Sequence, residues 1–88
     1  MSALNILHRD LFHKLGTELE VLSDSATLHA FLNLQPHVRI RPEVREDGRI
    51  MFVLRDARIT RSVAYAVFES ATDVIRHAHE QLQEQGGN

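Results

Sequence analysis

Hydrophobic residues recur every three or four positions at the start of the chain. This period predicts an amphipathic helix over residues 2–15, which we expect Gly16 to end. Residues 17–22 alternate between polar and apolar side chains, a pattern that fits either a short edge strand or an extended connector. The apolar stripe of the first helix consists of Leu4, Leu7, Leu11 and Leu15, with Ile6 and Phe12 flanking it.

A second helix is predicted directly before the middle of the chain. Ser23, Asp24 and Ser25 are favoured N-cap residues, and Pro36 stops the apolar run that follows them. A third helix is predicted near the end, after a cap at Ser70. It has the apolar stripe Ala71, Val74, Ile75, Ala78 and Leu82.

Between these helices the hydrophobic period changes to two, which predicts strands over residues 38–44 and 49–55. A two-residue loop at Asp47 and Gly48 would mix apolar and charged residues on each side of the hairpin. A three-residue loop with Gly48 in the left-handed bulge position instead collects the apolar residues on one side. The resulting pairs are Val44 with Ile50, Pro42 with Phe52, and Ile40 with Leu54.

A third strand is expected to follow a short turn at residues 55–58, which would place Leu54 against Ile59. Strand alternation then directs one set of residues toward the helices and the other set toward the opposite face. The inward set is Ile59, Val63, Tyr65 and Val67, and the outward set is Thr60, Ser62, Ala64 and Ala66.

These elements predict an α+β protein with two N-terminal helices, a three-stranded antiparallel meander and a C-terminal helix packed on the sheet. Residues 17–22 are the candidate for an extra edge strand. With 88 residues, the chain fits one domain, residues 1–88, with a helical part over residues 1–36 and a strand-and-helix part over residues 37–85.

The predicted hairpin carries arginines on the side away from the helices. The same register sets Arg45 against Arg49 and Arg39 against Arg55, and directly opposed like charges cost about 0.2–1 kcal/mol. Either an anionic partner offsets this cost, or the arginines are solvated or paired with acidic residues of a helix. On the first interpretation, the partner-binding residues are Arg39, Arg41, Arg45, Arg49, Met51, Val53, Arg55, Thr60 and Ser62.

Charge is unevenly distributed along the chain. The formal net charge is −2, but residues 39–61 contain seven arginines and four acidic residues, a surplus of +3. The remaining residues therefore carry −5. A pI of about 6.3 argues against a general nucleic-acid binder, whose domain pI usually exceeds ~9. The chain has no cysteine, no long apolar segment and no signal-peptide pattern, so we expect a cytoplasmic protein that makes no membrane contact.

Catalytic and metal-binding motifs are not evident. The closest histidine pair, His77 and His79, is two residues apart, whereas a zinc pair on a helix needs wider spacing. The acidic pairs at Glu18 and Glu20 and at Glu46 and Asp47 are expected on a solvated strand face and in a turn. We therefore expect a protein that is not an enzyme and holds no cofactor or metal.

Two resemblances concern parts of the chain. The order of helix, three strands and helix from Asp24 onward resembles a double-stranded-RNA-binding domain, although Ala71, Thr72 and Asp73 stand where that family has adjacent lysines. The part from Arg39 onward resembles the DNA-binding domains at the start of some phage-type integrases, in which an arginine-bearing sheet enters the major groove. Neither resemblance assigns a family.

Three hypotheses follow from the sequence. The first is a small regulator, adaptor or inhibitor that binds an acidic protein surface through the arginine side of the sheet, with Met51 and Val53 giving apolar contact. The second is nucleic-acid binding by the same side, with phosphate contacts from Thr60 and Ser62. The third is a structural homo-oligomer, for example a homodimer, formed through the leucine-rich first helix or the open sheet.

Overall fold

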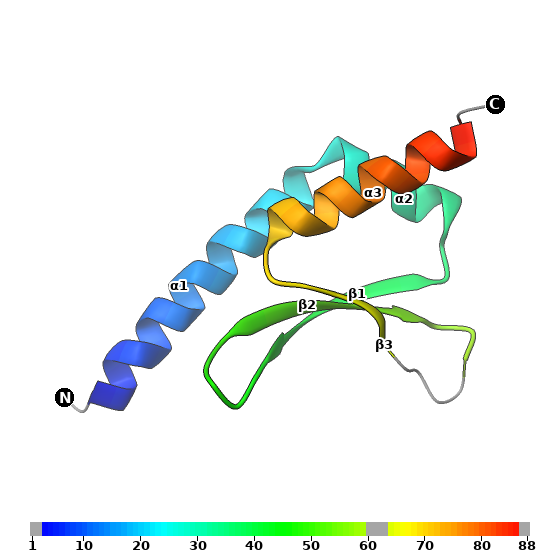
Figure 1. Ribbon diagram of the computed structural model, residues 1–88. Helices are drawn as coiled ribbons and strands as arrows, with labels where there is room; N and C mark the ends of the chain where they lie inside the picture. The colour runs from blue at the N-terminus through cyan, green and yellow to red at the C-terminus, as the bar shows by residue number, and fades with distance from the viewer. Residues whose placement is uncertain (1–2, 60–63, 87–88) are drawn as a thin grey trace.

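The computed structural model describes residues 3–59 and 64–86, and it describes the side chains from residue 12 onward within these ranges (Figure 1). The α+β architecture predicted from the sequence is confirmed. The elements are α1 (Ala3–Asp24), α2 (Ala26–Leu34), β1 (Val38–Val44), β2 (Ile50–Asp56), β3 (Ala64–Phe68) and α3 (Ala71–Gly86).

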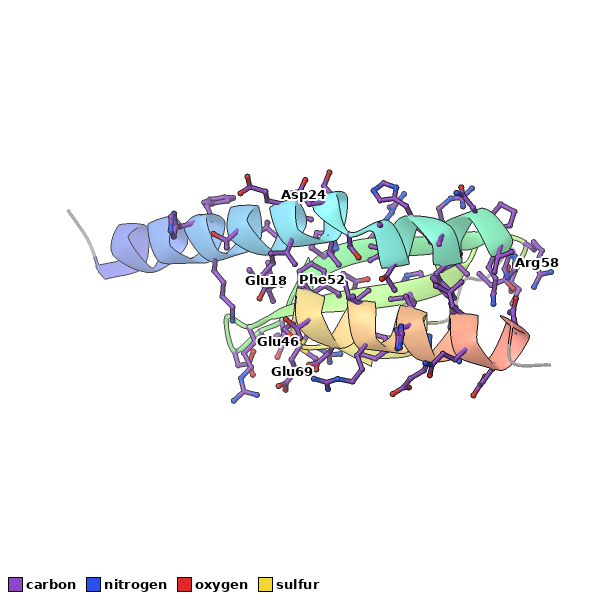
Figure 2. All side chains as sticks on the ribbon, turned by 90° about the horizontal axis from the view of Figure 1, so that it is seen from above. Glu18, Asp24, Glu46, Phe52, Arg58 and Glu69 are labelled. Atoms are coloured by element: carbon purple, nitrogen blue, oxygen red, sulfur yellow. The ribbon has the colours of Figure 1, made fainter. Side chains whose placement is uncertain are left out.

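The helices cover one face of an antiparallel sheet with strand order β1-β2-β3 (Figure 1). Seen from above, α1 and α2 form one row and α3 forms a second, with Phe52 labelled between them (Figure 2). Phe52 and Leu54 of the central strand are fully buried, together with Phe31 of α2 and Val74 of α3. The core therefore lies between the two helical rows and the inner face of β2.

The predicted register of the first hairpin is confirmed at every position. Val44 pairs with Ile50, Pro42 with Phe52 and Ile40 with Leu54. Gly48 has a φ of 84°, and its amide donates to the carbonyl of Arg45 at 2.9 Å. The amide of Arg45 donates to the carbonyl of Arg49 at 2.8 Å. These contacts define the type I turn with a left-handed bulge that the apolar pattern requires.

The predicted pairing of the third strand is wrong. Leu54 lies opposite Ala66 rather than Ile59, and Phe52 lies opposite Phe68. The reason is that β2 continues to Asp56, so the connection to β3 is longer than four residues, and the register shifts between Leu54 and Arg55. The large Phe68 ring thereby reaches the covered side of the sheet, where it packs against the core.

This register reverses the expected sides of the third strand. Ala66 faces the helices, whereas Tyr65 and Val67 remain 49% and 39% exposed. The expected outward position of Ala64 is confirmed by its pairing with Arg55. The predicted site residues Thr60 and Ser62 lie outside the described residues.

The predicted end of the first helix is also wrong, because α1 continues through Gly16 to Asp24 and residues 17–22 are helical rather than extended. Leu15 and Leu22 explain this continuation, since both pack against the core from positions two helical turns apart. A glycine inside a helix costs about 1 kcal/mol relative to alanine. Full burial of a leucine side chain contributes about 1.5–3 kcal/mol, which outweighs that cost.

Candidate interaction surface

The face of the sheet away from the helices carries the arginines predicted from the sequence. We call this surface the open sheet face. The register places Arg39 opposite Arg55, Arg41 opposite Val53 and Glu43 opposite Met51, as predicted. The open sheet face consists of Arg39, Arg41 and Glu43 from β1, Met51, Val53 and Arg55 from β2, and Ala64 and Val67 from β3.

An apolar strip runs across the middle of the open sheet face. Val53 lies on this face and yet is only 4% exposed, because neighbouring side chains cover it on both sides. Its direct neighbours are Arg41 on β1 and Val67 on β3. Met51 is half-buried on the same strand. The open sheet face therefore combines apolar contact area with charged groups, a mixture typical of protein interfaces.

The like-charge pair of Arg39 and Arg55 is relieved within the protein. Arg55 forms an ion pair with Glu43 at 2.5 Å, diagonally across the hairpin. Arg39 turns toward the connection between α2 and β1, where its guanidinium donates to the carbonyl of Pro36 at 2.6 Å and to that of Val38 at 3.1 Å. Both side chains are thereby anchored within the protein, Arg39 by two backbone carbonyls and Arg55 by one carboxylate.

The arginines near the hairpin turn differ in their contacts. Arg49 lies 3.7 Å from Asp47 and 3.7 Å from Glu69, and its side chain is well exposed. Arg41 and Arg45 are exposed and make no ion pair or side-chain hydrogen bond to another described residue. Acidic neighbours thus satisfy part of the arginine set. Arg41 and Arg45 remain open for an external anion, and Arg41 lies directly opposite Val53 of the apolar strip.

Two hollows on the open sheet face differ in charge. A hollow of about 490 Å³ is lined by Arg39, Arg41, Arg55, Ala57 and Ile59, with no acidic residue in the lining. We call it the arginine hollow. The second, of about 660 Å³, lies toward the hairpin turn and mixes both signs of charge. Its lining includes Glu43, Arg45, Glu46, Asp47, Val53 and Arg55.

The turn beside the arginine hollow is held by Asp56 and Arg58. The Asp56 carboxylate accepts three hydrogen bonds from the Arg58 guanidinium, at 3.0, 3.2 and 2.6 Å, and one from the Arg58 amide at 2.9 Å. These hydrogen bonds hold the pKa of Asp56 well below its usual range. Burial and the Asp56 charge raise the pKa of Tyr65.

Two structural contacts had no clear signal in the sequence. The Glu18 carboxylate, expected on a solvated strand face, accepts a hydrogen bond from the amide of Ala71 at 3.0 Å. Figure 2 labels Glu18 between α1 and the start of α3. His77 packs its ring against Phe31 and Phe68, with centroids 5.9 and 5.1 Å away. These contacts join elements far apart in the chain, and local patterns do not report them.

Within residues 3–59 and 64–86, no three His, Asp or Glu residues are arranged to hold a metal ion. None of the helices described combines the length and apolar character needed to cross a bilayer. Comparison of the chain with protein-family models, with curated proteins and with solved structures finds no significant match. The open sheet face is therefore the feature of the molecule from which a function can be inferred.

Proposed function

We propose that this protein is a non-catalytic interaction module that binds an acidic protein surface through its open sheet face. The observation that carries the proposal is the arginine hollow, in which Arg39, Arg41 and Arg55 surround one depression with no acidic residue in its lining. Arginine binds carboxylates through a planar set of donors, often in bidentate geometry. A cytoplasmic location is part of the proposal, since a chain without cysteine is compatible with a reducing compartment.

Two of the three arginines of the hollow are held in place before a partner binds. Arg39 is anchored by the Pro36 carbonyl and Arg55 by Glu43, so little rotamer freedom remains for either side chain to lose on binding. Arg41 has no such anchor among the described residues and can turn toward an incoming carboxylate. The hollow thus offers two anchored guanidinium groups, of which that of Arg55 is already paired with Glu43, and one adaptable group at Arg41.

The surroundings of the hollow favour a protein over a nucleic acid. Glu43, Asp47 and Glu69 lie among the arginines and would repel a continuous row of phosphates. Half-buried Met51 and Val67, which is 39% exposed, offer apolar contact that acidic protein surfaces with exposed apolar side chains can use. The overall charge of −2 points the same way, because it gives no long-range attraction for nucleic acid.

Charge reversal at Arg41 tests the proposal. The probes are a fluorescently labelled peptide in which glutamate alternates with leucine, and labelled mixed-sequence oligonucleotides, both single-stranded and duplex. We expect the unmodified protein to raise the anisotropy of the peptide and Arg41→Glu to abolish that rise. Arg76→Glu is the matched control, because it makes the same charge change at an exposed arginine of α3.

Two other outcomes of this experiment would contradict the proposal. Oligonucleotide binding that weakens steeply with salt and is lost in Arg41→Glu would replace the proposal with nucleic-acid binding by the same face. Equal peptide binding by Arg41→Glu and the unmodified protein would contradict any role for the arginine hollow. Circular dichroism of both variants checks that the fold is kept.

A further inference from the structure

Helix α1 extends well beyond the other elements. Its 22 residues span about 33 Å, and its N-terminal half projects past α3 and the sheet (Figure 1). Phe12 on this projecting part is 69% exposed, and Leu19, seven residues later and on the same side of the helix, is 41% exposed. An apolar side of α1 is therefore left uncovered.

The sequence extends this apolar side to the start of the helix. Leu15 and Leu22 are the positions at which α1 packs against the core. Leu4 and Leu11 precede Leu15 by 11 and four residues, about three turns and one turn, which the helical repeat aligns with it. The pattern that packs the C-terminal half of α1 onto the core thus continues into the half that projects past α3 and the sheet (Figure 1).

A groove lies beside the C-terminal half of the same helix. Its volume is about 600 Å³. It lies between α1 and α2 on one side and the inner face of β1 on the other. Val44, at the end of β1 on the same inner face, is 56% exposed. The apolar residues of the groove are Leu19, Leu22, Leu28, Leu32, Ile40 and Pro42.

We propose that two copies of this chain form a two-fold symmetric dimer in which their α1 helices pack antiparallel. The N-terminal half of each α1 then lies in the groove of the other copy. Antiparallel packing brings the projecting half of one helix beside the C-terminal half of its partner, where Leu19 and Leu22 line the groove. The two-fold axis therefore makes the same contact twice, so the projecting half of α1 and the groove are covered in both copies. This is the arrangement of an isologous interface.

The charges of α1 are complementary for this orientation. Residues 3–14 contain two basic residues and one acidic residue, a surplus of +1, whereas residues 15–24 contain three acidic residues and no Lys or Arg. Antiparallel packing places unlike charges together, and parallel packing places like charges together. The charged residues are Arg9, Asp10 and Lys14 in the first half and Glu18, Glu20 and Asp24 in the second.

The free edge of β1 is a poorer site for a second copy. In the observed register Val38, Ile40, Pro42 and Val44 direct their backbone groups toward this edge. Pro42 has no amide hydrogen, and the amide of Val38 already donates to the carbonyl of Gln35 at 3.0 Å. Strand-to-strand pairing would therefore be interrupted, whereas helix packing in the groove needs no backbone hydrogen bond.

Multi-angle light scattering tests the dimer. The unmodified chain should have twice its monomer mass of 10.1 kDa. Phe12→Glu and Leu19→Glu should each reduce the mass to that of the monomer, with an unchanged circular dichroism spectrum. His13→Glu is the control, since this exposed neighbour of Phe12 points away from the groove side of α1 and should leave the dimer intact. A monomeric unmodified chain, or a dimeric Phe12→Glu, would overturn the proposal.

Single cysteines test the orientation, because the chain has no cysteine of its own. The two copies of Phe12→Cys lie near the two-fold axis and should form an intermolecular disulfide under mild oxidation. The two copies of Ser23→Cys should lie about 28 Å apart along the helices and should not cross-link. A dimer in which Ser23→Cys cross-links efficiently would show parallel packing and overturn the antiparallel arrangement.

Discussion

Removal of the Glu18 carboxylate should loosen the junction between α1 and α3. Glu18 accepts the amide hydrogen of Ala71, the first residue of α3, and Ala71 is fully buried. Ser70 accepts the amide hydrogen of Asp73 at 3.2 Å. Side chains therefore satisfy two of the amides at the start of α3, one of them from a helix 53 positions earlier in the sequence.

The expected cost follows from these contacts. An unpaired buried amide costs about 1–3 kcal/mol. Loss of the interaction between a carboxylate and a helix N-terminus costs about 0.3–1 kcal/mol more. We expect Glu18→Ala to lower the free energy of unfolding by about 2 kcal/mol. Glu18→Gln keeps an oxygen acceptor and loses only the charge, so about 1 kcal/mol is expected. Glu20→Ala, an exposed change on the same helix, should stay within about 0.5 kcal/mol.

Urea unfolding measures all three variants, and an unchanged m-value would show that the midpoints report stability. Native-state hydrogen exchange adds a local measurement, because the Ala71 amide should lose protection in Glu18→Ala. This role of Glu18 is refuted if Glu18→Ala and Glu20→Ala unfold at the same urea concentration. It is also refuted if the Ala71 amide exchanges equally slowly in both variants.

Two further predictions concern the turns of the sheet. Gly48→Ala should lower the free energy of unfolding by about 1–2 kcal/mol in urea, because φ is 84° there and a Cβ meets no atom within 4 Å, so backbone strain alone acts. Arg58 lowers the pKa of Asp56, so their pairing stabilises the fold above the usual Asp pKa of 3.8 and is lost as pH falls below it. Asp56→Asn should therefore make the acid unfolding curve less steep.

The first hairpin could be predicted to the residue because independent signals agree. The apolar residues of both strands have one period, and only a three-residue loop brings them to the same side. Gly48 is the residue that tolerates the required positive φ. Pro42 also agrees with this hairpin, because β1 is an edge strand and the amide hydrogen that proline lacks is not needed on its outer side.

The third strand could not be predicted in the same way because both of its sides carry apolar residues. Tyr65 and Val67 have as strong a strand pattern as Ala66 and Phe68, and alternation alone does not choose between them. The choice depends on Phe68, whose ring packs against His77 of α3. That contact is tertiary, as is the burial of Leu22 that carries α1 through Gly16.

The side of the sheet on which the hairpin arginines lie followed from the sequence, but their partners did not. Glu43 was predicted opposite Met51, and it lies there, yet its carboxylate reaches diagonally to Arg55. Arg39 binds backbone carbonyls that no residue pattern reports. The distinction between anchored arginines and Arg41, on which the proposed function depends, therefore required the structure.

The groove and the arginine hollow open on opposite sides of the sheet, with Arg39 at the β1 edge in the lining of both, so a dimer formed through α1 leaves Arg41 and Arg55 of both copies accessible. Such a dimer binds bivalently to a densely coated surface, where a second contact forms at high effective concentration. The unmodified protein should therefore dissociate from an immobilised glutamate–leucine peptide more slowly than monomeric Phe12→Glu does. Both proteins should bind the free peptide in solution with equal affinity. Weaker binding by Phe12→Glu in solution would instead place part of the peptide site on the helical side.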